Sequence, residues 1–151
     1  MLFKMGDILE EVIYEMNHED IIMSPEEYDL YHGTDFWYCG IRCDVTFKSC
    51  KEKGNTVGLG SIKTDLMPVH IGVRTGNAYE KFDYPVCVIS FDALLVKGNR
   101  AKELIASILT EELLDEAITL FWDGCDRHHI DIPDYDEAWS CLYPLHHKEV
   151  I

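Results

Sequence analysis

The middle of the chain strongly favours a β-sheet. Four segments are rich in aromatic and β-branched side chains, as strands are: residues 36–47, 56–62, 68–74 and 85–91. Turn-forming sequences, Lys53-Gly54-Asn55 and Thr75-Gly76-Asn77, lie between some of them. Short connections join antiparallel neighbours. We therefore expect an antiparallel meander of about four strands, with the almost wholly apolar segment Val86–Phe91 at a central position.

The two ends of the chain favour helices. Apolar residues recur at spacings of three and four over residues 6–17, 99–109 and 111–122, with a break near Thr110. Ser24-Pro25-Glu26-Glu27 has the form of a capping box and predicts a helical turn over 25–30. These patterns predict one α+β domain over residues 1–151, its sheet flanked by an N-terminal helix and two C-terminal helices.

Negative charge is concentrated at both ends. The 151 residues have a net charge of −15, divided as −8 over residues 1–30, +1 over 31–98 and −8 over 99–151. A chain this acidic is repelled by phosphate backbones and anionic membranes, which argues against direct binding of either. No apolar run approaches the roughly 18–20 residues of a membrane span, and the first residues do not resemble a signal peptide. We expect a cytoplasmic protein, in the host cytoplasm if the chain is phage-encoded.

The last segment, residues 123–151, contains the residue types that bind zinc. Cys125 and His128 form one close pair and Cys141 and His146 another, with twelve residues between the pairs. Four nitrogen and sulfur ligands in two such pairs are typical of a closed, structural zinc site. Since this segment has little periodicity, a metal would order what packing does not. His129 and His147 are alternative ligands. Cys39, Cys43 and Cys50 are interpreted as half-buried thiols of the sheet, with a second metal site as the alternative.

The zinc prediction is tested by elemental analysis of protein purified without added metal. We expect close to one equivalent of zinc, and lower thermal stability in His128→Ala and Cys141→Ala. Stability should also fall below about pH 6, because cysteine ligands must ionise and histidine ligands must be neutral. Less than about a tenth of an equivalent, with both variants thermally neutral, would contradict the site.

A second motif suggests enzymatic chemistry. Tyr31-His32-Gly33-Thr34 resembles the nicotinamide-binding motif of ADP-ribosyltransferases and related RNA phosphotransferases. The resemblance implies an NAD-consuming enzyme in which His32 contacts the ribose. The sequence departs from that family at Ile62, where the family has a stacking tyrosine, and it has no convincing catalytic glutamate on a late strand. This is the alternative to the hypothesis that follows.

Acidic residues near the C-terminus favour a binding protein. Glu111 and Asp115, and likewise Glu112 and Glu116, are like-charge pairs one helical turn apart, which destabilise a helix by a few tenths of a kcal/mol each. Rows of carboxylates roughly 5–6 Å apart can present a basic cleft with charges resembling a phosphate backbone. We therefore expect an acidic, non-enzymatic inhibitor of a basic nucleic-acid-handling protein. The residues expected to bind this partner are Glu111, Glu112, Asp115, Glu116, Asp134, Asp136 and Glu137.

In size, acidity and lack of a catalytic signature, the chain resembles the small phage-encoded anti-CRISPR proteins that block Cas9-type nucleases. The resemblance implies competition with guide RNA, with target DNA or with a moving lobe of the nuclease. Restriction inhibitors and toxin-neutralising immunity proteins share the same features and remain open alternatives. Plain solubility is the simplest alternative for any single acid.

Overall fold

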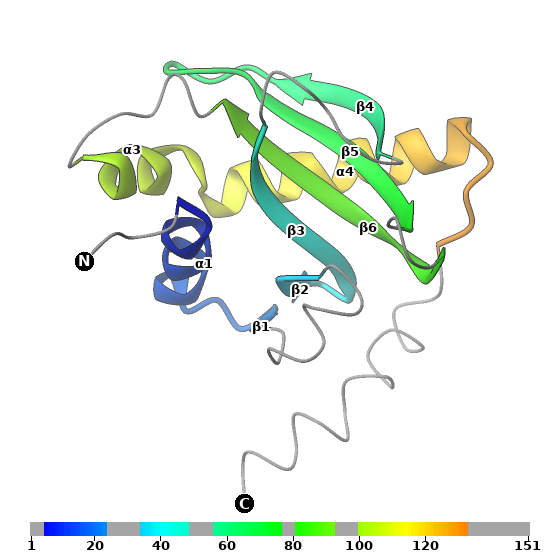
Figure 1. Cartoon of the computed structure of the whole chain (residues 1–151), viewed down its shortest axis with the longest axis horizontal. Coiled ribbons are helices and arrows are strands. Elements are labelled where there is room, and N and C mark those ends of the chain that lie inside the picture. Colours follow the sequence, from blue (N-terminus) through cyan, green and yellow to red (C-terminus); the bar gives the residue numbers. More distant parts are fainter. Residues whose placement is uncertain (1–4, 24–33, 49–55, 77–80, 93–99, 133–151) are drawn as a thin grey trace, which may run out of the picture.

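Within the described residues, six strands form one mixed sheet and three helices cover one of its faces (Figure 1). The structure is a computed structural model that describes residues 5–23, 34–48, 56–76, 81–92 and 100–132. The helices are α1 (Met5–Met16), α3 (Ala101–Ile108) and α4 (Glu111–Arg127). The strands are β1 (Ile21–Met23), β2 (Phe36–Tyr38), β3 (Ile41–Lys48), β4 (Thr56–Ile62), β5 (Val69–Gly76) and β6 (Lys81–Asp92). The α+β class predicted from the sequence is confirmed.

The strand order is β1-β2-β3-β6-β5-β4. All neighbours run antiparallel except β3 and β6, which pair in parallel with Cys43 opposite Cys87. The prediction of about four antiparallel strands is therefore wrong in number and in the direction of one pair. The central position predicted for Val86–Phe91 is confirmed. Strand β6 is apolar on both faces, as is typical of a central strand. It pairs with β5 on one side and with β3 on the other.

The segment predicted as one strand over 36–47 is instead a tight hairpin of β2 and β3. Tyr38 pairs with Ile41, which leaves Cys39 and Gly40 as a two-residue turn. Both turn residues have positive φ angles, 50° and 81°, as the common two-residue hairpin turns require. Glycine adopts such angles freely, but cysteine is not a typical turn residue. The sequence therefore lacked the usual turn signal, and the three-residue strand β1 was too short to show a pattern.

The core lies between the helices and one face of the sheet. Alternate residues of the central strand, among them Ile89 and Phe91, are buried against helical side chains such as Ile13, Ile105 and Phe121. Strand side chains alternate between faces, so a single set of strand residues meets all three helices. The helices therefore expose their opposite sides to solvent.

The end of α4 lies five residues beyond the predicted limit of 122. Gly124 and Cys125 are both buried in this added turn. A side chain at Gly124 would put a Cβ atom 2.6 Å from a methyl group of Leu59, so glycine permits the close approach of α4 to β4. Glycine disfavours helices, which is why the periodicity indicated an earlier end. The predicted break near Thr110 is confirmed, because Thr110 is the N-cap of α4.

The sheet face away from the helices contains buried charge. Arg42 is 3% exposed, and its guanidinium carbon lies 4.3 Å from the ring centre of Tyr84 and 5.8 Å from that of Trp37. Arg74 and Asp44 form an ion pair of 2.9 Å across the central strand. Basic side chains on this face are therefore held by aromatic rings and by an acid of the sheet itself. None of the described helices is long and apolar enough to span a membrane.

Adjacent residues of α4 provide a test of this packing. Phe121 is fully buried, whereas Trp122 is 45% exposed. We expect Phe121→Ala to lower the free energy of unfolding by about 3–5 kcal/mol, because it leaves a cavity in the core. Trp122→Ala should cost less than about 1 kcal/mol. Urea denaturation measures both, and equal losses would contradict the orientation of α4.

Candidate functional site

Charge is segregated between the two layers of the molecule. The three described helices contain eleven acidic and two basic residues. The six strands contain three acidic and four basic residues. Since all three helices cover the same face of the sheet, the layer that they form has most of the acidic residues of the described helices and strands. The candidate functional site is this helical surface, centred on the first two turns of α4.

The four acids predicted at the start of α4 are all exposed: Glu111, Glu112, Asp115 and Glu116. The Thr110 hydroxyl accepts a hydrogen bond from the Leu113 N–H at 3.3 Å and begins the helix there. Acids in a first helical turn are stabilised by the helix dipole, which partly offsets their mutual repulsion. The other predicted partner residues, Asp134, Asp136 and Glu137, lie outside the described residues.

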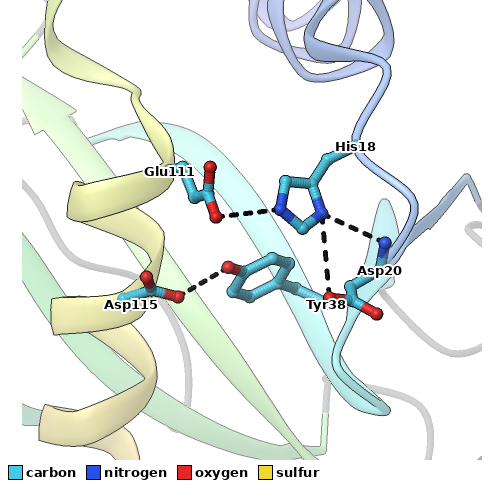
Figure 2. Close-up of polar contacts among 5 residues, drawn as sticks. All are labelled: His18, Asp20, Tyr38, Glu111 and Asp115. Atoms are coloured by element: carbon cyan, nitrogen blue, oxygen red, sulfur yellow. Dashed lines mark hydrogen bonds and ion pairs between the residues drawn. The ribbon is translucent and has the colours of Figure 1, made fainter.

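The structure divides these four acids into two pairs. Glu111 and Asp115 face the α1–β1 connection and β2, where they bond to His18 and Tyr38 (Figure 2). Glu112 and Glu116 lie one residue further round the helix and make no hydrogen bond or ion pair with any residue that the structure describes. The first pair therefore connects α4 to neighbouring elements, and the second pair makes no such connection within the described residues.

His18 connects the end of α1 to the start of α4. Its Nε2 lies 3.0 Å from a carboxylate oxygen of Glu111, and its Nδ1 accepts a hydrogen bond from the Asp20 N–H at 3.0 Å. The imidazole packs edge-on against the Tyr38 ring, with ring centres 5.6 Å apart. The hydrogen bond to Glu111 raises the pKa of His18 above 6.5, against a smaller opposing effect of burial. Nearby acids, including Glu19, raise the pKa further.

Tyr38 is the buried partner of the second acid. Its hydroxyl donates a hydrogen bond of 2.5 Å to Asp115, across 77 residues of sequence. Burial, followed by this hydrogen bond, raises the pKa of Tyr38 far above its ordinary value. Burial and then the charge of Asp20 raise the pKa of the neighbouring Cys39 thiol. At neutral pH both groups are thus protonated, so Cys39 is a poor nucleophile.

Both basic residues of the helices are used inside the molecule. The Lys102 ammonium lies 2.7 Å from Glu15 and 2.9 Å from Glu11, which joins α3 to α1. Hydrogen bonds, first to Glu15 and then to Glu11, raise the pKa of Lys102. Arg127 donates a hydrogen bond to the backbone carbonyl of Leu59 at 3.2 Å. The negative charge on the rest of the helical surface is therefore left uncompensated.

Two of the four predicted zinc ligands can be placed. Cys125 is fully buried on the core side of α4, where burial and then the nearby Cys87 raise its pKa to about 11. His128 is exposed, directly after the helix ends. Cys141 and His146 lie outside the described residues. Within the described ranges, no group of three or more His, Cys, Asp or Glu side chains is arranged to hold a metal. Structural zinc therefore remains a prediction.

The remaining sequence candidates are buried or cannot be placed. Cys39 is half-buried, as expected, but Cys43 is fully buried because it faces the helical core. Burial and then its neighbour Cys87 raise the pKa of Cys43 well above its ordinary value. Cys50 and His32 lie outside the described residues. Ile62, at the position of the stacking tyrosine in ADP-ribosyltransferases, is buried.

Sequence reasoning missed His18, Tyr38 and Lys102. Each is an isolated residue in its own segment, and its partner lies between 77 and 93 positions away. Periodicity predicts which side of a helix is polar, but it does not predict which of those polar residues meets another element. No family model, curated protein or solved structure matches this chain.

The His18–Glu111 pair makes a pH-dependent contribution to stability. A raised pKa means that this contribution is fully present below pH 6.5 and is lost as the pH rises through the folded-state value. We expect NMR titration to give His18 a pKa above 6.5, and Glu111→Gln to lower it. Glu112→Gln makes the same charge change one residue away and should leave the value almost unchanged. Equal effects of the two variants would contradict the pairing.

Proposed function

We propose that this chain is a non-enzymatic inhibitor whose acidic helical surface occupies a basic, nucleic-acid-handling site on a larger protein, such as a CRISPR nuclease. The observation that supports this most directly is the segregation of charge. Eleven acids and two internally bonded bases belong to one layer, and the other layer is close to neutral. Such a layer presents a negatively charged surface to a basic partner.

The exposed acids have a spacing suited to this role. Glu112 and Glu116 are one helical turn apart, so their Cβ atoms are roughly 5–6 Å from each other. A row of negative charges at this spacing competes with a phosphate backbone for a basic channel and speeds association at low ionic strength. Electrostatic attraction of this kind weakens as salt rises.

Exposed aromatic residues on the same helices support a protein partner. Trp122 on α4 is 45% exposed and Tyr14 on α1 is 71% exposed. Tryptophan and tyrosine are the residue types that most often anchor protein interfaces. An acidic surface with aromatic anchors suits a folded protein better than a small ion.

Zinc, bound by Cys125, His128, Cys141 and His146, belongs to the same proposal as a structural brace for residues 123–151. The place of action is the cytoplasm, that of the host if the chain is phage-encoded. Direct contacts with nucleic acid or with a membrane have no part in this function.

The test is DNA cleavage by a guide-loaded Cas9-type nuclease at increasing concentrations of the protein. We expect inhibition that weakens with salt, and an inhibitory concentration raised at least about tenfold by Glu112→Gln combined with Glu116→Gln. The control removes two other exposed charges, with Glu103→Gln and Asp123→Asn, and should change it less than about threefold.

Two further outcomes separate this function from its alternatives. If the chain is an inhibitor, the His32→Ala variant should inhibit as well as the unchanged chain. If the chain is an ADP-ribosyltransferase, the unchanged chain should consume NAD and the variant should not. Undiminished inhibition by the Glu112 and Glu116 double variant would contradict the proposal. Failure of the unchanged chain to inhibit a Cas9-type nuclease would contradict the proposal for that partner. The same variants would then be tested against restriction enzymes and toxins.

A further inference from the structure

A cleft of about 550 Å³ lies between the β4–β5 connection and the corner of α3 and α4. The apolar part of its lining includes Ile62 and Leu113, both almost fully buried. Leu66 also borders the cleft and is 51% exposed. Glu112 and Glu116 line the α4 side. The two acids that are not bonded within the described protein thus border a hollow whose lining combines apolar and polar side chains.

Both walls of the cleft are held in place by local hydrogen bonds. The Thr64 hydroxyl accepts from the N–H groups of Leu66, at 3.3 Å, and Met67, at 3.0 Å, and donates to the Met67 carbonyl. On the other side, the Thr110 cap fixes the first turn of α4. A wall that is already ordered costs little conformational entropy when a ligand binds.

The charge of the lining favours a cation. Asp65, Glu112 and Glu116 line the cleft together with one base, Lys63, which gives a net charge of −2. The N-terminal dipole of α4 opposes a cation, but its effect falls off within the first turn. Glu116 lies beyond that turn and is the stronger attraction for a positive group.

We propose that this cleft binds an arginine side chain of the partner, with the guanidinium group between Glu112 and Glu116. This inference rests on the proposed function and names the kind of residue that the acidic surface recognises. A guanidinium group is planar, has five N–H donors and bonds two carboxylates at once, which a lysine ammonium does less well. Its three-carbon stem suits an apolar lining that includes Ile62 and Leu66.

Substitution of Lys63 should change the affinity for arginine in the opposite direction from substitution of the acids. Lys63 lines the same cleft, so its positive charge repels an incoming cation. Lys63→Gln should therefore tighten binding of arginine about threefold, whereas Glu116→Gln should weaken it at least about fivefold. General loosening of the fold would change both variants in the same direction.

The experiment is NMR titration of the isotope-labelled chain with N-acetyl-arginine amide. We expect saturable shifts confined to residues 62–66 and 107–116, and at least fivefold weaker binding of N-acetyl-citrulline amide, which has the same shape without the charge. The lysine analogue should bind less tightly than arginine.

Asp123→Asn removes a charge elsewhere on α4 and should leave the affinity almost unchanged. Ser107→Phe, which fills the cleft from α3 without changing charge, should abolish binding; its fold is checked by circular dichroism.

Three outcomes would overturn the inference. They are shifts spread evenly over the helical surface, equal binding of the citrulline probe, and an equal effect of Glu116→Gln and Asp123→Asn. Its failure is distinguishable from failure of the proposed function. Nuclease inhibition that depends on Glu112 and Glu116, without a site for the arginine probe, rejects only the cleft. A saturable arginine site in a chain that inhibits no basic partner rejects only the function.

Discussion

Burial of one sheet face under all three described helices is the constraint on which the other features depend. The apolar side of each helix, with residues such as Ile13, Ile105 and Phe121, is committed to this one core. A helix that is apolar on one side exposes the other, so most of the acids of these helices lie on the sides away from the core, while Asp115 reaches Tyr38 of β2. The segregation of charge is therefore a direct consequence of the layered fold. A fold with helices on both faces of the sheet would have divided the same acids between two surfaces.

Such a surface is under electrostatic repulsion, and the structure shows where the repulsion is relieved. Lys102 lies between two acids of α1, and His18 meets Glu111 at the start of α4. Tyr38 adds a neutral donor to Asp115. These contacts connect α1 to α3, the α1–β1 connection to α4, and β2 to α4. These contacts reduce the repulsion only where they occur. The outer side of α4 keeps its negative charge.

The sequence was informative where a feature depends on residues close together. Helical periodicity placed three helices and the break at Thr110, and the apolar run of β6 indicated its central position. Prediction from the sequence failed where a feature depends on an untypical residue or on pairing between distant segments. The Cys39-Gly40 turn lacks the usual signal, and Gly124 continues a helix that its propensity would end. Nothing local indicates that β3 pairs in parallel with β6, because that pairing follows from where β4 and β5 lie.

The candidate site shows the same division between local and distant information. Exposure of Glu111, Glu112, Asp115 and Glu116 follows from helical phase alone and was predictable. Their separation into a structural pair and an exposed pair depends on His18 and Tyr38, which no spacing rule connects to α4.

This separation into two pairs of acids is a feature that the proposed recognition of a partner uses and that solubility alone does not require. A solvated face needs only charge, in any arrangement, and gains nothing from a cleft beside it. Here the buried apolar residues of α4 set its rotation relative to the sheet, and the bonds to Glu111 and Asp115 are consistent with that rotation. That rotation places Glu112 and Glu116 at the cleft beside the β4–β5 connection. Glu111 and Asp115 connect the start of α4 to His18 and Tyr38, so loss of the His18 contact should loosen the turn of α4 that presents Glu112 and Glu116.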